Sequence, residues 1–490
     1  MGSEMCIRDS CNTRTRHSIE FDLAAGVGKD GRLLAKDMHS YSNQGAYASH
    51  GHAIAANGLT SWRLQYACPN IRGEAYTIYT NTPVGGAMRG YGIPQVCFAI
   101  ESFMDDVANE IHMDPLEFRR KNLIQGYYED AYLKPIAANT NGIFECLEKG
   151  AEYIHWDEKR KEYAEQAGDV RKGVGMALFS YKTGVWPISL EIAGARLSLN
   201  QDGSVQLMLG ATEIGQGADT VFSQMVAETL HTDMEHVHIK TVQDTDVSPF
   251  DTGAYASRQS FVTGTAVRHC AEILRDKILA YAKTLLPEID TRELTLKDNW
   301  IWAGDEQAIS LAALAEESYY SLTNSSVLTA EVSEQVKKNT IATGCCFAEV
   351  EVDIKLGKIK ILHIINVHDS GKLLNPQLAE MQVHGGMSMG MGYGISEQLI
   401  LDEKTGRPLN GNLLDYKLMT MLDTPDIKAD FVELCDPMGP YGNKALGEPP
   451  AIPCAPAIRN AVLHATGVAF YENPLTPQRL IDGFKKAGLI

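Results

Sequence analysis

Residues 347–365 read FAEVEVDIKLGKIKILHII, two runs of alternating apolar and polar residues on either side of a glycine turn. This pattern is typical of a β-hairpin. Two further stretches repeat it around Asp-Gly, SIEFDLAAGVGKDGRLLAKDMHSYS at 18–42 and ARLSLNQDGSVQLML at 195–209. An amphipathic helix is a poor alternative because a glycine interrupts each stretch. The sequence therefore predicts three β-hairpins.

Helical spacing occupies the regions between these hairpins. One helix face is predicted from residues Val96, Ile100, Phe103, Val107 and Ile111, with Pro94 suited to the first turn. Two more helices are predicted across 221–229 and 262–274, and a charged, tyrosine-rich helical connection across 127–170. We therefore expect an α+β fold in two lobes, with one domain over 11–140 and a second over 141–490.

The opening residues, MGSEMCIRDS, carry neither an apolar run nor amphipathic spacing. The stretch Glu-Met-Cys-Ile-Arg-Asp is similar to a sequencing adapter translated in frame. We therefore treat residues 1–10 as an artefact outside the fold. The expectation that follows is a natural chain extending upstream of Cys11, with an upstream domain missing here.

Composition excludes several classes of partner. The 490 residues include 62 acidic and 44 basic side chains, a net charge of −18, whereas nucleic-acid binding requires clustered Lys and Arg. No run of eighteen apolar residues is present, so no membrane span is expected. The ten cysteines form no C-x-x-C, which disfavours a zinc ribbon or an iron–sulfur cluster in this chain. Reduced thiols in a cytoplasmic protein are the simplest interpretation.

Five segments rich in glycine and small residues are predicted to be loops, each leading into a helix. They are TPVGGAMRGYGIP at 82–94, GATEIGQGA at 210–218, TGAYASRQ at 252–259, QVHGGMSMGMGYG at 382–394 and NKALGEPP at 443–450. Helix N-termini present unpaired N–H groups, and glycine lets a ligand approach the backbone. None matches G-x-G-x-x-G after a strand or G-x-x-x-x-G-K-[ST]. Together they indicate an unusual, anionic cofactor that the spacing alone does not name.

Two charged residues in these segments are candidates for chemistry. Glu448 lies between Gly447 and two prolines, a stiff turn that would suit a desolvated general base or an ordinary surface loop. Arg89 is a candidate phosphate ligand or a surface salt-bridge partner. The histidines at 363, 368 and 384 show no metal-binding spacing, and the methionines at 387, 389 and 391 are expected to pack. No G-x-S-x-G nucleophile signature is present.

In this order, the motifs GGAMRGYGIPQ, GATEIGQGADT, ASRQ, NPQLAEMQVHGG and KALGEPP resemble one family. It is the molybdenum-binding subunit of xanthine dehydrogenase, within the xanthine oxidase and aldehyde oxidase group of molybdenum hydroxylases. The resemblance covers residues 11–480 and is closest to bacterial enzymes built from separate subunits. It implies a two-lobed molybdopterin-binding fold.

The resemblance also implies a cofactor and the residues that hold it. The cofactor is molybdopterin with molybdenum, in bacteria extended to molybdopterin cytosine dinucleotide. Met88 and Arg89 fall beside the metal, and Gln216, after Gly215, is similar to the glutamine near its oxo face. The pterin and its tail would be lined by Gln382 and by Ala254, Tyr255, Ala256, Ser257, Arg258 and Gln259. Arg89 and the backbone of Ala256 would lie next to the molybdenum without ligating it.

The implied reaction is an oxidative hydroxylation with water as the source of oxygen. In the family, the glutamate at the position of Glu448 deprotonates a Mo–OH group, and hydride passes to Mo=S. Electrons then leave through [2Fe–2S] clusters and FAD. Because this chain has no sequence signature for either, partner subunits carrying iron–sulfur clusters and FAD are expected, in a heterotrimer that could form dimers.

The substrate implied is a purine or a related N-heterocycle. Tyr91 occupies the place of an aromatic ring that stacks on the substrate, and Trp186, next to Val185, is a weaker candidate for the second ring. The xanthine-orienting arginine aligns with Asn57, a departure that leaves xanthine itself open. Oxidation of aldehydes and a cofactor-free scaffold are the alternatives. A cysteine before Arg89, required for carbon monoxide oxidation, is absent from Gly85–Met88.

Overall fold

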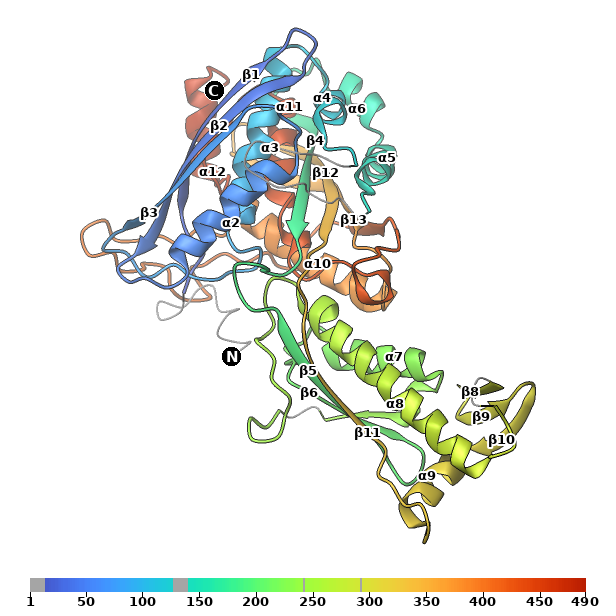
Figure 1. The fold of residues 1–490 in the computed structure, drawn as a ribbon. Coiled ribbons are helices and arrows are strands. Elements are labelled where there is room, and N and C mark those ends of the chain that lie inside the picture. The colour runs from blue at the N-terminus through green and yellow to red at the C-terminus, as the bar shows by residue number, and fades with distance from the viewer. Residues whose placement is uncertain (1–13, 127–139, 241–242, 291–292) are drawn as a thin grey trace.

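The computed structural model describes residues 14–126, 140–240, 243–290 and 293–490. Its chain forms two lobes, one above the other in Figure 1. The first lobe contains the beginning and the end of the described chain. The second lobe is built from the middle of the chain. The α+β, two-lobed fold expected from the sequence is therefore confirmed, whereas Cys6, Cys11 and the predicted artefact at 1–10 lie outside the described residues.

The first lobe is organised around a four-stranded sheet with the order β14-β13-β12-β4. Its strands are β4 (Val170–Lys182), β12 (Ile341–Asp353), β13 (Lys358–Asp369) and β14 (Ile427–Phe431). Strands β12 and β13 form the antiparallel hairpin predicted over 347–365. β12 also pairs with β4, from Ile341 opposite Lys182 to Asp353 opposite Val170. Strands β4 and β12 are buried on both faces along most of their length, as a sheet covered by helices requires.

Helices cover this sheet closely because glycines in β4 leave room for them. Helix α11 (Cys454–Thr466) crosses β4, where a Cβ added to Gly175 would lie 2.1 Å from the backbone nitrogen of Ala461. The remaining helices of this lobe are α2 (Gly51–Leu64), α3 (Ile93–Glu110), α4 (Pro115–Asn122), α5 (Ile143–Ile154), α6 (Trp156–Glu162), α10 (Pro376–Ile395) and α12 (Pro477–Lys486). Short helical turns lie at Pro440–Gly442 and at Pro449–Ala451.

A second sheet of the first lobe has the order β1-β2-β3. Strands β1 (Ile19–Val27) and β2 (Leu33–Gly45) form the predicted hairpin, with Ile19 opposite Ser42. β3 (Ile71–Tyr79) joins β2 in parallel after α2 has crossed between them. The parallel strand follows a helix because two neighbouring parallel strands need a crossover connection.

The second lobe has a sheet of order β11-β5-β6-β7 that shares one hydrophobic core with three helices. Its strands are β5 (Ile192–Leu199), β6 (Val205–Leu209), β7 (Val237–Ile239) and β11 (Thr329–Gln335), and its helices are α7 (Ala218–Leu230), α8 (Gly264–Leu285) and α9 (Leu311–Tyr320). A smaller sheet contains β8 (Leu294–Lys297), β9 (Trp300–Ala303) and β10 (Glu306–Ser310), and single turns lie at Met234–His236 and Gln259–Thr263. β5 and β6 form the third predicted hairpin. Gln335 at the end of β11 lies opposite Ile192 at the start of β5.

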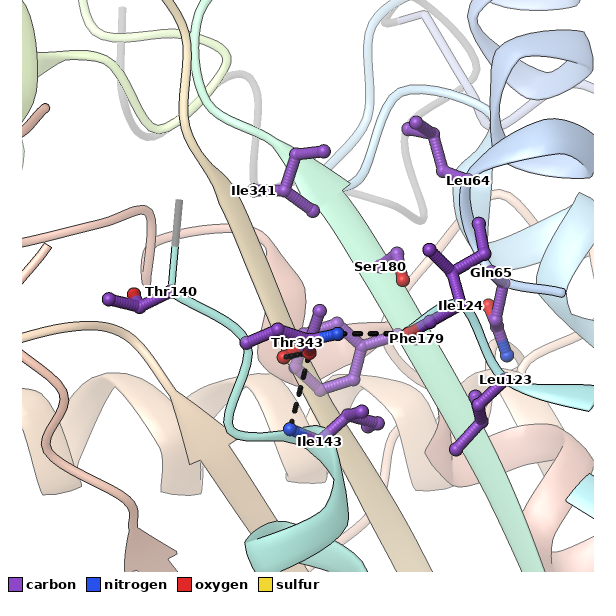
Figure 2. A pocket seen from close by; sticks show the side chains of 11 residues that line it. Leu64, Gln65, Leu123, Ile124, Thr140, Ile143, Phe179, Ser180, Ile341 and Thr343 are labelled. Atoms are coloured by element: carbon purple, nitrogen blue, oxygen red, sulfur yellow. Dashed lines mark hydrogen bonds between the residues drawn. The ribbon is translucent and has the colours of Figure 1, made fainter. Parts of the chain in front are cut away.

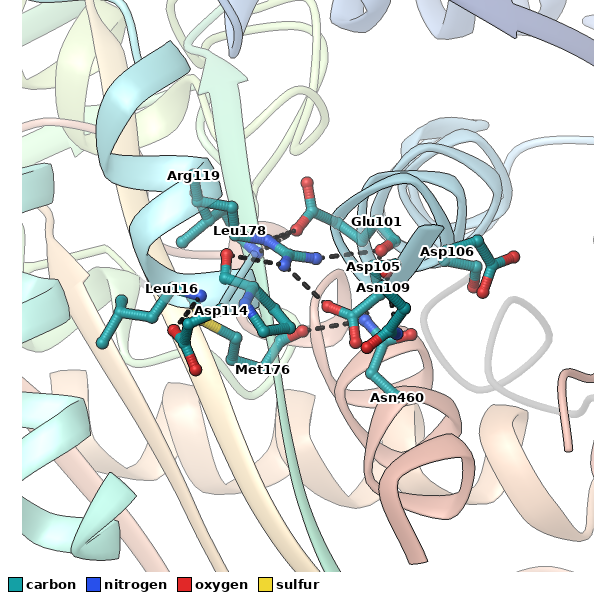
Figure 3. A network of polar contacts seen from close by, with 12 residues as sticks. Glu101, Asp105, Asp106, Asn109, Asp114, Leu116, Arg119, Met176, Leu178 and Asn460 are labelled. Carbon is teal, nitrogen blue, oxygen red and sulfur yellow. Dashed lines mark hydrogen bonds and ion pairs between the residues drawn. The ribbon is translucent and has the colours of Figure 1, made fainter. Parts of the chain in front are cut away.

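A fully buried arginine ties four elements of the first lobe together. Arg119 of α4 binds Glu101 at 2.9 Å and Asp105 at 2.7 Å, both on α3, and all three side chains are almost completely excluded from solvent (Figure 3). The Glu101 carboxylate also accepts a hydrogen bond from the Leu178 N–H of β4 at 3.0 Å. Asn460 of α11 donates to the Glu101 carbonyl at 3.2 Å. The charges satisfy one another, as buried charges must.

The helix predicted from Val96 to Ile111 is present as α3, with Pro94 in its first turn, and the two later helices are α7 and α8. The helical connection predicted across 127–170 is present as α5 and α6, although residues 127–139 lie outside the described residues. The prediction of a loop at 382–394 is wrong, because this segment is entirely within α10. The domain boundary at 140 and 141 stays a prediction.

No helix in the described part of the chain is both long and apolar enough to cross a bilayer. The cysteines of the described ranges are free thiols, and seven of the eight are buried. Burial raises the pKa of the thiols of Cys97, Cys146, Cys345 and Cys346. These cysteines are core residues.

Candidate active site

The five segments predicted to hold a cofactor lie on both lobes. Four of them are loops, and they precede α3, α7, the turn at Gln259–Thr263 and the turn at Pro449–Ala451. The fifth is the glycine-rich part of α10. Hydrogen bonds between side chains and backbone connect these segments across long sequence separations, as the following residues show.

Arg89 joins three of the segments. Its Nε donates to the Gly447 carbonyl at 2.7 Å, and its Nη2 donates to the Gln382 carbonyl at 3.0 Å. The carbonyl of Arg89 in turn accepts a hydrogen bond of 2.9 Å from Nη2 of Arg16. The Met88 carbonyl, one residue earlier, accepts from the N–H of Tyr91 at 2.8 Å. Arg89 therefore holds the turn that carries Glu448 against α10.

The 252–259 segment reaches the same turn through Ser257. Its Oγ accepts a hydrogen bond of 2.9 Å from the N–H of Glu448. Ala256 and Ser257 have φ angles of +49° and +48°, in the left-handed region that residues with a Cβ seldom occupy. Such strain persists only where the surrounding structure imposes it, and it is common at functional sites.

The 210–218 segment is joined to the 252–259 segment through two glutamines. Nε2 of Gln216 donates to Oε1 of Gln259 at 2.7 Å and to the Thr212 carbonyl at 2.9 Å. The carboxylate of Glu213 accepts from the N–H groups of Gly215 at 2.6 Å and Gly217 at 3.2 Å. Although burial acts to raise the pKa of Glu213, these backbone donors hold it below its ordinary value. The carboxylate of Glu213 thus fills the concave turn before α7.

Arg258 and Tyr255 differ in burial, although they lie in the same segment. The Arg258 side chain is fully buried and pairs with Glu191 and Asp251, each at 2.6 Å. Its guanidinium lies 5.5 Å from the centre of the Tyr255 ring, which is 37% exposed. Ala254, between Gly253 and Tyr255, is partly exposed. Arg258 therefore donates to the protein itself.

Glu448 is electrostatically distinct from the other carboxylates of the site. Burial raises its pKa to about 7, against the opposing effects of Arg89, the Gly90 backbone and Arg16. Its Oε2 is excluded from solvent and has no hydrogen-bond partner among the described residues. A buried acceptor without a partner is costly in an ordinary core and is expected where a ligand will supply the contact. A carboxyl group that titrates near neutrality is suited to proton transfer.

Tyr91 is fixed at both ends beside Glu448. Its hydroxyl lies 2.8 Å from Nδ1 of His50, and its carbonyl accepts from Nδ2 of Asn57 at 2.9 Å. Its φ of +48° lies between two glycines that are also left-handed. Burial raises the pKa of Tyr91, and the charge of Glu448 adds to this effect. Asn57, the residue aligned with a substrate-binding arginine, therefore binds the Tyr91 backbone.

Trp186 lies on the loop that follows β4 and is partly exposed. Its carbonyl accepts from Nδ2 of Asn339 at 2.8 Å. The nearby N–H of Gly184 donates to the Ala256 carbonyl at 3.0 Å. The Trp186 loop is therefore attached to the segment that binds Glu448.

The three histidines considered as metal ligands are separate in the structure. His363 binds Glu349 at 2.7 Å, and His384 lies 3.7 Å from Glu380. His368 is fully buried, and burial lowers its pKa to about 3. Over the described ranges, no group of three His, Cys, Asp or Glu side chains is placed to hold a metal ion.

Sequence reasoning missed several residues that build the site, namely Arg16, His50, Glu191, Glu213 and Asp251. Their partners are distant, as with Arg16 and Arg89, or are backbone N–H groups, as with Glu213. The one available signal was the position of Glu213, directly before a glycine-rich turn into a helix.

The glycines of α10 allow this helix to pack closely against the turn that follows Glu448. A Cβ added to Gly386 would lie 2.3 Å from Cβ of Pro450, whereas one at Gly385 would meet only Nη1 of Arg89, at 3.8 Å. We expect Gly386→Ala to lower the unfolding free energy by about 1–3 kcal/mol through overpacking. Gly385→Ala is expected to raise it by up to about 1 kcal/mol, because alanine favours helix. Urea unfolding of both variants measures this difference, and equal effects would contradict the packing argument.

A small cavity lies elsewhere in the first lobe. Its volume is about 30 Å³, and its lining includes Gln65, Phe179 and Thr343 (Figure 2). This is room for about one water molecule. Because its lining contains none of the residues predicted for the site, we regard it as a packing defect.

Comparison with known proteins gives consistent likenesses. Residues 149–425 and 7–123 match the family of molybdopterin cofactor-binding domains. The chain is 47% identical over 490 residues to the xanthine dehydrogenase molybdenum-binding subunit of Escherichia coli O157:H7, which covers 99% of this chain and 65% of that relative. It thus spans about 65% of the relative's length.

More distant proteins are similar in sequence or in fold. The aldehyde oxidoreductase molybdenum-binding subunit PaoC of Escherichia coli K12 is 27% identical over 477 residues, covering 96% of this chain and 61% of PaoC. The crystal structure of quinoline 2-oxidoreductase from Pseudomonas putida 86 superposes with a TM-score of 0.89 at 23% identity, covering 97% of this chain and 63% of that one.

Proposed function

The chain belongs to the family of molybdopterin cofactor-binding domains, and from that premise we propose that it is the molybdenum-binding, catalytic part of a molybdenum hydroxylase of the xanthine dehydrogenase type. The proposed reaction is oxidative hydroxylation of a purine or related N-heterocycle, with water as the source of oxygen. One observation carries the proposal: a carboxylate with a pKa near 7 and an unpartnered, buried oxygen lies where loops of both lobes meet.

The residues present fit a molybdopterin cofactor. The buried Oε2 of Glu448 lacks a partner within the described ranges, and the surrounding loops offer glycines and backbone groups that suit a bulky anionic ligand. We propose that Met88, Arg89, Gly215, Gln216, Gln382 and the 254–259 segment, apart from the Arg258 side chain, hold it in its cytosine dinucleotide form. When bound, the cofactor would supply a two-electron redox centre.

The part of Glu448 in this reaction is that of a general base. Its side chain accepts a proton at the unpartnered Oε2, and its desolvation makes the carboxylate a stronger base. Arg89 keeps the turn in place and tempers the basicity by its positive charge. Tyr91, fixed by His50 and Asn57, would present its ring to a flat substrate, and Trp186 would supply the second ring.

The electrons released would leave through other proteins. We propose partner subunits carrying [2Fe–2S] clusters and FAD, in a cytoplasmic heterotrimer that forms dimers. The support for this arrangement is the relative's own description as a molybdenum-binding subunit.

The pH profile provides a test of the base. Glu448 is ionised only above its pKa of about 7, so kcat/KM is expected to fall about tenfold per pH unit below that value. Above pH 8 this group causes no further change. The measurement is kcat/KM between pH 5 and 9 in the assembled enzyme, and a profile that is flat down to pH 5 would contradict the assignment.

The reaction class is tested by metal analysis and substrate comparison. We expect about one molybdenum per chain in the assembled complex and turnover of hypoxanthine in preference to an aromatic aldehyde. Preference for the aldehyde would move the assignment to aldehyde oxidation. A complex without molybdenum would identify the chain as a scaffold and overturn the proposal.

A further inference from the structure

We propose that Arg258 is a positioning residue, which fixes Glu448 through Ser257 and the Trp186 loop through Glu191. This proposal rests on the proposed function, in which Glu448 is the base. Arg258 would then act inside the protein, in contrast to the cofactor contact expected from its position in the ASRQ motif.

The contacts of Arg258 leave it little capacity for a ligand. Nε donates to Glu191 at 2.6 Å, and Nη1 donates to Asp251 at 2.6 Å and to the Gly253 carbonyl at 3.1 Å. Nη2 donates to the Ile192 carbonyl at 2.8 Å. The three charged side chains are almost completely excluded from solvent. Because two carboxylates flank one guanidinium, the cluster would repel a phosphate.

The same residues impose the backbone shape of the segment. Asp251 also accepts hydrogen bonds from Oγ1 of Thr263 at 2.7 Å and from the N–H of Gly253 at 2.8 Å. Arg258 is thereby anchored directly after Ala256 and Ser257, the two left-handed residues. Their conformation costs free energy, and a rigid anchor on the next residue is the kind of constraint that maintains it.

This shape is transmitted to Glu448 in the first lobe. The left-handed turn presents Oγ of Ser257 to the N–H of Glu448, at 2.9 Å. A Cβ at Gly447 would lie only 3.3 Å from that oxygen, so the two turns are in close contact. A change at Arg258 is therefore expected to shift the turn that carries the base.

The Arg258 cluster also contacts the loop that carries Trp186. The Glu191 carboxylate, which binds Arg258, also accepts a hydrogen bond from the N–H of Val185, the residue before Trp186. The Ala256 carbonyl accepts from Gly184 at 3.0 Å. One buried ion cluster therefore connects the base to the loop that is a candidate for substrate contact.

Ser257→Ala tests the link to Glu448 with little risk to folding. In the assembled holoenzyme we expect kcat to fall about tenfold, because a small displacement of a catalytic group is costly, with KM and molybdenum content within about twofold of the parent. Ser257→Gly favours positive φ but also lacks the hydroxyl, so its kcat should fall equally. Ser318→Ala, which removes a buried hydroxyl from α9, is the control and should retain parental kcat. Unchanged kcat in Ser257→Ala would overturn the proposal.

Arg258→Met tests the cluster itself, with Arg119→Met as its matched control. Both remove a fully buried arginine from between two carboxylates, so both should lower the unfolding midpoint. Only Arg258→Met is expected to lower kcat, by at least tenfold, and to alter KM through the Trp186 loop. If Arg258→Met cannot be purified folded, the serine variants decide the question.

A double variant separates positioning from general damage. Because Arg258 and Ser257 act on the same turn, Ser257→Ala should reduce kcat much less in the Arg258→Met background than in the parent. Independent, multiplicative losses would overturn the coupling. Full activity in Glu448→Gln would instead refute the proposed function, whereas an inactive Glu448→Gln with fully active Ser257 and Arg258 variants would refute only the positioning role.

Discussion

Replacing Glu448 with glutamine is expected to lower kcat by about 10²–10⁴-fold while leaving molybdenum bound. Glutamine keeps the shape of the side chain and the backbone N–H that donates to Ser257, but it cannot accept the proton. The measurement is steady-state turnover alongside metal content in the assembled enzyme. Full turnover with bound molybdenum would remove Glu448 from the mechanism.

The same substitution should stabilise the protein in alkaline solution. The folded-state pKa of Glu448, about 7, exceeds its ordinary value of 4.5, so the folded state binds this proton more tightly than the unfolded state. The resulting stability is present below pH 4.5 and is lost as the pH rises through 7. We therefore expect Glu448→Gln to exceed the parent in unfolding free energy by about 1–3 kcal/mol at pH 8, and much less at pH 5.

Turnover and unfolding free energy, measured together, distinguish a functional carboxylate from a structural one. If the carboxylate had a structural role, its substitution would destabilise the protein, as happens when one partner of a buried ion pair is removed. A drop in unfolding midpoint at pH 8, measured in urea, would therefore contradict the assignment even if activity also fell.

Arg119→Met is expected to cause the largest loss of stability in the first lobe, about 3–5 kcal/mol. It would leave Glu101 and Asp105 charged and buried without their partner. Burial raises the pKa of both carboxyl groups even with Arg119 present, so part of the loss would be relieved by protonation in acid. Urea unfolding at pH 8 and pH 5 measures both effects.

Arg120→Met is the matched control on the neighbouring residue. Arg120 pairs with Glu117 and Glu148, whose side chains are largely exposed, so its loss should cost no more than about 1 kcal/mol. Equal effects of the two substitutions would show that the Arg119 cluster contributes no more than a surface pair.

Local sequence signals predicted the elements whose partners are near in the chain. Alternation around Asp30-Gly31 and Leu356-Gly357 fixed two hairpins because both strands and the turn lie within one stretch. Pairings between distant strands, such as β13 with β14, left no such signal. The segment predicted as a loop forms α10 instead, because its glycines serve contact with Pro450, a tertiary demand that local propensity does not reveal.

For the site, too, the sequence predicted some features and not others. The ordered motifs identified the family and placed Glu448, Arg89 and Ser257 in segments that meet in space. What sequence reasoning could not supply was the direction of each side chain. The resemblance predicts a cofactor contact for Arg258, whereas its guanidinium donates to Glu191 and Asp251. Asn57, at the position that aligns with the xanthine-orienting arginine, binds the Tyr91 carbonyl.

The pairing of Lys182 with Ile341 makes the whole second lobe an insertion between two adjacent strands of the first. Closing a loop of that length would ordinarily cost entropy, by about 0.6 kcal/mol for each doubling. The second lobe offsets this cost by folding, because its own β5–β11 pair brings Ile192 beside Gln335. Because β12 follows the inserted lobe in the chain, the β4–β12 pair can form only after that whole lobe has been synthesised.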